Sequence, residues 1–142
     1  GSSTSGTSPP PGGPSGLVFL PMTETVVLEV PAAASLYSVI RLVVGGMAAR
    51  ADLTISEIDE LSMAVEEVLR AAHDPASPAR VRLEIRAEGG RLHILAGPFN
   101  SPDLPARLRR PCCDLILRVV DHDVWRGPQG AHSVHIIKAR RF

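Results

Sequence analysis

The side chains best suited to metal binding in this sequence are two adjacent cysteines, Cys112 and Cys113, and five histidines. Zinc sites usually use pairs spaced as C-x₂-C or H-x₃₋₅-H, so that two ligands leave the same turn of the backbone. Neither the cysteines nor the histidines have this spacing. We therefore expect no metal site, cysteines that act as small buried hydrophobic residues, and ordinary surface or strand histidines at positions His73, His93, His122, His132 and His135.

Acidic side chains are concentrated in the segment 57–67, where a general base or a charged contact surface would need them. Thr54 and Glu57 have the spacing of a capping box, which gives Glu57 a structural role at a helix start. Glu67 could act as a general base, although a glutamate on a surface helix is most often a solvated helix former. The set Asp59, Glu60, Glu66 and Glu67 also has two interpretations, an acidic contact patch for a partner or a solvated helix surface. We favour the solvated surface.

Tyr37 and Arg41 lie one helical turn apart, and Gly45 follows one turn later, beside an apolar stripe. Tyrosine and arginine are enriched among residues that dominate binding energy, so the pair is a candidate partner-binding surface. The alternative is an arginine whose stem covers the edge of the core while its charge reaches water. The sequence leaves both interpretations open.

The elements that must position these residues belong to one domain of ordinary size. Residues 1–16 are almost entirely Gly, Ser, Thr and Pro, and we expect a disordered tail that is compatible with an expression tag in part. Residues 17–142 form the predicted domain, since 44% of the 142 residues are hydrophobic. Fifteen basic residues balance fifteen acidic ones, which argues against nucleic-acid binding. No segment is predicted to cross a membrane, and the low cysteine content favours the cytoplasm.

Hydrophobic spacing predicts the order strand, two helices, hairpin, helix, strand. Alternation is clearest in ARVRLEIRA, and the Gly89-Gly90 turn joins it to the strand RLHILA in a hairpin. Gly45 and Gly46 interrupt the first helix and indicate either fraying or a close approach. We predict an α+β fold, a two-layer sandwich with helices on one face of a mostly antiparallel sheet. The expected strands are 25–30, 79–87, 91–96 and 133–138, the helices are 33–49, 54–72 and 115–120, and the segment 97–111 is irregular.

Residues 26–68, VVLEVPAAASLYSVIRLVVGGMAARADLTISEIDELSMAVEEV, resemble the first half of bacterial anti-sigma factors with serine-kinase activity. The likeness rests on the strand that ends in V-P, the I-R-L of the first helix, the S-E-I-D-E-L helix start and the A-V-E-E that follows. RLHIL and the closing segment LILRVVDHDVW are also similar to that family. The resemblance implies the Bergerat-type fold of the GHKL ATPase superfamily, and it places Arg41 on the arginine of the family's I-R-L segment.

The same resemblance shows where the expected ATP site is incomplete. Glu67 matches the family's catalytic glutamate, but Ala71 stands where an asparagine would hold Mg²⁺, a cation that requires oxygen ligands. The segment 96–100 lacks the aspartate that would recognise adenine. Pro111-Cys112-Cys113-Asp114 replaces the glycine-rich phosphate loop. We therefore expect Glu67 to be vestigial and neither ATP nor Mg²⁺ to be a cofactor.

Three functional hypotheses follow from the resemblance. The first is a regulator that binds a sigma factor, its anti-anti-sigma antagonist, or both, without phosphorylating either. The second is an active ATP-dependent serine kinase whose displaced metal ligand comes from Asp74, Asn100, Ser101 or Asp103. The third is a homodimerisation or scaffold module that no longer regulates a sigma factor.

Overall fold

The computed structural model of the chain describes residues 23–73 and 80–140, so the tail predicted for residues 1–16 lies outside the described part. The elements follow the predicted order, with additions after residue 96. They are β1 (Thr23–Pro31), the 3₁₀ turn η2 (Ala34–Leu36), α1 (Tyr37–Arg50), α2 (Ile55–Ala72), β2 (Arg80–Glu88), β3 (Arg91–Phe99), α3 (Leu104–Leu108), α4 (Pro111–Leu117), β4 (Asp121–Arg126), the 3₁₀ turn η3 (Pro128–Gly130) and β5 (His132–Ala139).

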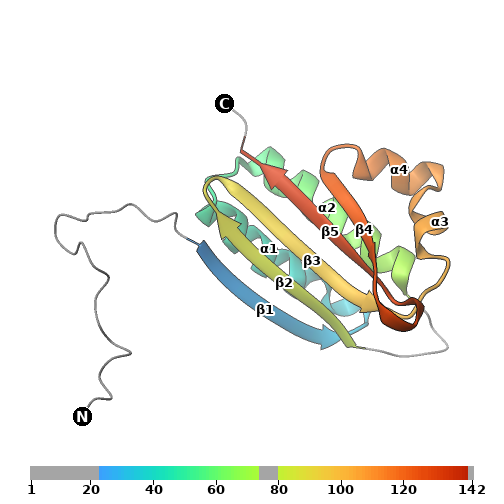
Figure 1. Ribbon diagram of the computed structural model, residues 1–142. Helices are drawn as coiled ribbons and strands as arrows, with labels where there is room; N and C mark the ends of the chain where they lie inside the picture. The colour runs from blue at the N-terminus through green and yellow to red at the C-terminus, as the bar shows by residue number, and fades with distance from the viewer. Residues whose placement is uncertain (1–22, 74–79, 141–142) are drawn as a thin grey trace, which may run out of the picture.

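The described strands form one antiparallel sheet in the order β1-β2-β3-β5-β4. Helices α1 and α2 lie together behind this sheet, and α3 and α4 lie at its β4 end (Figure 1). The predicted α+β class and the helix-on-sheet arrangement are therefore present. Gly89 and Gly90 both have positive φ angles, which the predicted two-residue hairpin turn between β2 and β3 requires.

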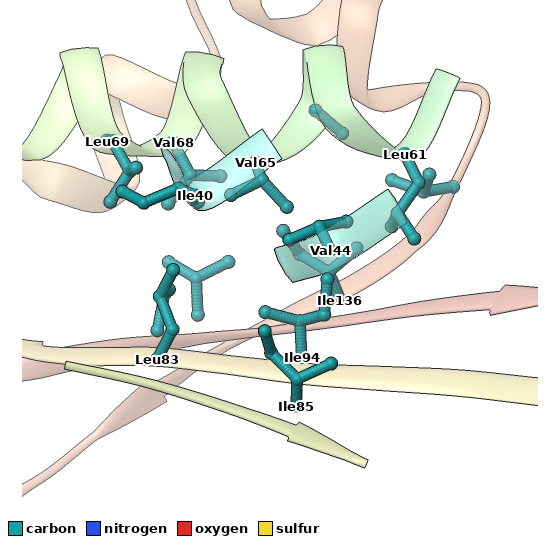
Figure 2. Packing of buried hydrophobic residues seen from close by; sticks show 14 of the residues in the cluster. Ile40, Val44, Leu61, Val65, Val68, Leu69, Leu83, Ile85, Ile94 and Ile136 are labelled. Atoms are coloured by element: carbon teal, nitrogen blue, oxygen red, sulfur yellow. The ribbon is translucent and has the colours of Figure 1, made fainter. Parts of the chain in front are cut away.

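The core lies between the sheet and the two long helices. Figure 2 shows branched aliphatic side chains from α1 and α2 pointing toward those of the strands. Alternation places Leu83 and Ile85 of β2 on the inner face, where both are fully buried. Each such side chain contributes about 1.5–3 kcal/mol by leaving water. The other labelled core residues are Ile40, Val44, Leu61, Val65, Val68, Leu69, Ile94 and Ile136.

The start of α2 is fixed by the predicted capping box. Glu57 N–H donates to Thr54 Oγ1 at 3.2 Å, and Thr54 N–H donates to Glu57 Oε1 at 2.8 Å. Two backbone N–H groups of the first turn thereby find partners. The helix runs without interruption to Ala72, as predicted, with Val65, Val68 and Leu69 buried in the core. Glu66, Glu67 and Arg70 lie between these positions, on the less buried side of the same helix.

The prediction was wrong for the segment 97–120. The expected irregular connection contains the end of β3 and the short helix α3, and the helix expected at 115–120 is instead α4, which begins at Pro111. Pro105 and Pro111 occupy first-turn positions of these helices, where a missing N–H leaves no intrahelical bond unmade. These two prolines, which the sequence analysis took as a sign of irregular structure, therefore stand at the starts of helices.

Strand β4 was not predicted because its sequence, DHDVWR, has no apolar alternation. It pairs only with β5 at the edge of the sheet, where polar side chains are common. The first helix also differs from the prediction, since residues 34–36 form a 3₁₀ turn before α1 begins at Tyr37.

Lys138 is a charged residue on the inner face of β5, and only 4% of its side chain is exposed. Its Nζ donates to Glu60 Oε1 at 2.8 Å and to the carbonyl oxygen of Val119 at 2.6 Å. A buried ammonium needs such partners to offset its lost hydration. The ion pair therefore ties the end of β5 to α2 and to the segment after α4.

Candidate functional site

Arg41 projects from α1 toward α2, where it meets Glu66. Both Arg41 Nε and Nη2 lie 2.8 Å from Glu66 Oε2, a geometry that fixes the plane of the guanidinium group. The arginine side chain is 47% exposed, whereas the glutamate side chain is 13% exposed. Arg41 thus presents part of its charge to solvent from a position that Glu66 holds.

Tyr37 lies one turn before Arg41 and packs partly against the core. The Arg70 guanidinium carbon is 5.8 Å from the centre of its ring, which is within the range of a cation–π contact. Burial raises the pKa of the Tyr37 hydroxyl, and the Arg70 charge opposes that effect. Arg70 also lies 3.6 Å from Glu66. Tyr37, Arg41, Glu66 and Arg70 therefore form one connected group, here called the α1–α2 cluster.

Glu67 is adjacent to this cluster but faces α4. Its side chain is 13% exposed, with Oε1 lying 3.6 Å from Arg70 Nη1. Its second oxygen, Oε2, accepts a hydrogen bond from the thiol of Cys113 at 3.3 Å. The carboxylate is thus held between a cation and a thiol, in contrast to a solvated helix former.

The two cysteines differ in environment. Cys113 is buried, as expected, whereas Cys112 is exposed, contrary to the expectation of a buried hydrophobic residue. Burial, and then the neighbouring Glu67 carboxylate, raises the pKa of Cys113 to about 12. The thiol sulfurs and a Glu67 oxygen all lie within 4.8 Å of one another.

At position 71, where the resemblance would place an asparagine ligand for Mg²⁺, the backbone takes part in a different interaction. The Ala71 carbonyl accepts a hydrogen bond from Arg107 Nη1 at 2.9 Å. Arg107 Nε also donates to Asp103 at 2.8 Å, and the hydroxyl of Ser101 donates to the same carboxylate at 3.3 Å. Four residues were considered as oxygen ligands for a displaced cation. Two of them, Ser101 and Asp103, are hydrogen-bonded to each other. Asn100 is exposed, and Asp74 lies outside the described residues.

Two of the histidines form a second polar group on the opposite face of the sheet. His93 Nδ1 and His135 Nε2 are 3.2 Å apart, and the two rings stack with their centres 5.4 Å apart. The Trp125 ring lies 4.9 Å from that of His135. These residues line an open cleft of about 430 Å³ with Arg86 of β2. His132 is instead buried, with Nδ1 3.1 Å from the Ser101 carbonyl oxygen.

Tyr37, Arg41 and Glu67, the candidate site residues expected from the sequence, lie on neighbouring parts of α1 and α2. The contact between Glu67 and Cys113 was not expected from ligand spacing, because such spacing relates residues that are close in sequence and these two are 46 positions apart. The family resemblance was the available signal, since it assigned both segments to one nucleotide site. A comparison with models of known protein families gave no match, and neither did a comparison with curated proteins. No helix in the described ranges has the length and apolar character needed to span a bilayer.

Proposed function

We propose that this chain is an anti-sigma-factor-like regulator that binds a sigma factor, an anti-anti-sigma protein, or both, and does not act as an ordinary ATP-dependent kinase. The proposal includes a GHKL-type assignment for the α+β fold and a cytoplasmic location in a bacterium. The observation that carries it is the half-exposed Arg41, held by Glu66 beside Tyr37 on the outer surface of the helical layer. Such a pre-oriented arginine loses little side-chain freedom when it binds.

The chemistry of the α1–α2 cluster favours a partner that offers a carboxylate. Arg41 already shares its charge with Glu66, but a guanidinium group has five N–H donors and can serve a second acceptor. Tyr37 adds an aromatic surface next to this charge. Arginine and tyrosine at the centre of an interface commonly supply a large share of its binding energy.

The region that resembles a nucleotide site supports the non-kinase form of this proposal. Ala71 offers no side-chain oxygen for Mg²⁺, and its carbonyl oxygen already accepts a hydrogen bond from Arg107. Glu67 accepts a hydrogen bond from Cys113. Because phosphoryl transfer depends on a precisely placed cation and on electrostatic stabilisation, these contacts favour binding over catalysis.

The experiment that tests this function is capture of the partner from a cytosolic extract of the source organism on the immobilised full chain, followed by mass spectrometry. We expect a sigma factor or an anti-anti-sigma protein among the retained proteins, and their reconstitution with the chain from purified components. Retention of neither class, or failure of the purified proteins to bind, would contradict the proposal.

A further inference from the structure

Glu67, Cys112 and Cys113 bring three potential metal ligands together from α2 and the first turn of α4. Their ligand atoms lie within 4.8 Å of one another, and Cys113 Sγ is 3.3 Å from Glu67 Oε2. Two ligands of a tetrahedral zinc ion, one sulfur at about 2.3 Å and one oxygen at about 2.1 Å, are about 3.6 Å apart. The sulfur–oxygen pair is therefore close to the separation that a bound zinc ion would need.

We propose that these three residues bind one thiophilic divalent cation of the zinc class, with a fourth coordination position open to solvent or to a ligand. Three protein ligands and one open position are the arrangement of zinc sites that accept an exchangeable ligand. Cys112 is exposed, which gives the ion a route of entry, while Cys113 is buried behind it. This inference does not depend on the proposed regulatory function.

The ligand set selects against the hard cations of nucleotide sites. Sulfur ligands favour Zn²⁺ and other thiophilic ions, whereas Mg²⁺ requires an almost complete shell of oxygen ligands. The metal would displace one proton from each thiol, including the proton that Cys113 donates to Glu67 in the metal-free protein. One divalent cation, two thiolates and one carboxylate leave one net negative charge on the site.

Arg70 is placed to support this arrangement from outside the ligand shell. Its Nη1 lies 3.6 Å from Glu67 Oε1, the carboxylate oxygen that does not face Cys113. A cation there orients the carboxylate and partly balances the negative charge of the loaded site. Groups in this outer position commonly change metal affinity by about 10–100-fold when removed. Arg70 also joins the metal ligands to the α1–α2 cluster through Glu66.

The test is titration of the full chain, kept reduced by a non-chelating reductant, with Co²⁺ and then Zn²⁺. We expect one Co²⁺ per chain, thiolate-to-cobalt charge-transfer absorption, release of two protons, and displacement of the cobalt by Zn²⁺. Cys112→Ser and Glu67→Gln should each weaken binding by about tenfold or more. Asp59→Asn is the matched control, because this exposed carboxylate lies on the same helix about two turns before Glu67 and should leave the affinity unchanged.

Three results would overturn the site. The first is the absence of charge-transfer absorption at saturating Co²⁺. The second is equal affinity in the parent and in the Cys112→Ser variant, which would remove the exposed cysteine from the ligand set. The third is equal affinity in Glu67→Gln and Asp59→Asn, which would remove the Glu67 carboxylate from the ligand set. Far-ultraviolet circular dichroism of each variant verifies that the fold is retained.

Discussion

At the scale of single residues, the stacked pair His93 and His135 is expected to make the stability of the fold depend on pH. Burial lowers the pKa of both imidazoles below their ordinary value of 6.5, and Arg86 lowers each further. His135 also lowers that of His93, whereas Glu88 opposes the shift at His93 and Asp123 opposes it at His135. Below about pH 6.5 the two imidazoles therefore bind fewer protons in the folded state than in the unfolded chain.

This difference fixes the sign of the expected effect. The stability is fully present above pH 6.5, the ordinary value, and it falls as the pH drops through 6.5 toward the depressed folded values. Urea unfolding at about pH 7.5 and about pH 5.5 should show a lower midpoint at the acid value. The double variant His93→Gln/His135→Gln should show a smaller loss than the parent. An identical loss in the double variant would contradict this explanation.

The residue scale also shows what a sequence leaves undetermined. Tyr37 and Arg41 are neighbours on one helix, so their shared surface follows from spacing alone. The contact between Glu67 and Cys113 depends on how α2 packs against α4, which no local pattern encodes. Lys138 is a similar case: the alternation of β5 places it inward, but its partner Glu60 is 78 positions away.

At the scale of elements, the two glycines inside α1 are not required by the packing of the described chain. A Cβ on Gly46 would meet no atom within 4 Å, and one on Gly45 would make an ordinary 3.7 Å contact with Ile58. The helix continues past both residues to Arg50, which argues against fraying. We therefore expect Gly46→Ala to raise the free energy of unfolding by about 0.5–1 kcal/mol, the usual cost of glycine in a helix.

Gly97 in β3 provides the contrasting control. Its φ of +126° is unfavourable for other residues, and a Cβ there would lie 2.9 Å from Ser133 Oγ and 3.1 Å from the His132 carbonyl oxygen. Gly97→Ala should therefore destabilise the protein by about 1–3 kcal/mol. Denaturant unfolding of both variants measures the two effects. A destabilised Gly46→Ala variant would contradict the packing described for α1, whereas a stable variant with weaker partner binding would indicate close approach of a partner.

Elements were predictable wherever a local signal determined them. The capping box fixed the start of α2, and strict alternation with a Gly-Gly turn identified the β2–β3 hairpin. Strand β4 escaped detection because an edge strand can be polar, and α3 because its proline occupies the first turn. The errors therefore fall where tertiary pairing or helix-start chemistry overrides composition.

At the scale of the whole molecule, the proposal that the chain does not bind nucleotide in the ordinary way leads to a thermodynamic prediction. A ligand that binds only the folded state must raise its apparent stability by mass action. Thermal unfolding in millimolar Mg²⁺-ATP or Mg²⁺-ADP should show no upward shift of Tm. A reproducible shift that disappears in Glu67→Ala would support the active-kinase alternative instead.

The proposed function makes the whole molecule a rigid support for one interaction surface on its helical layer. Arg41 and Arg50 allow that surface to be separated from general charge effects, because both lie on α1 with similar exposure, 47% and 54%. Each is paired with a glutamate, Arg41 with Glu66 and Arg50 with Glu24. The exposed Arg50–Glu24 pair contributes only about 0–1 kcal/mol to stability. Glu66 is 13% exposed, but it keeps Arg70 at 3.6 Å when Arg41 is replaced, so alanine at either arginine should leave the fold nearly intact.

The most direct test of the regulatory proposal is the affinity of the Arg41→Ala and Arg50→Ala variants for the purified sigma factor or anti-anti-sigma protein. Calorimetric titration, with denaturant unfolding of each variant, separates binding from stability. We predict that Arg41→Ala loses on the order of 2–4 kcal/mol of binding free energy, mainly through faster dissociation, while Arg50→Ala binds as the parent does. Unchanged affinity in Arg41→Ala, together with a lowered unfolding midpoint, would contradict the proposal and make Arg41 a residue that only covers the edge of the core.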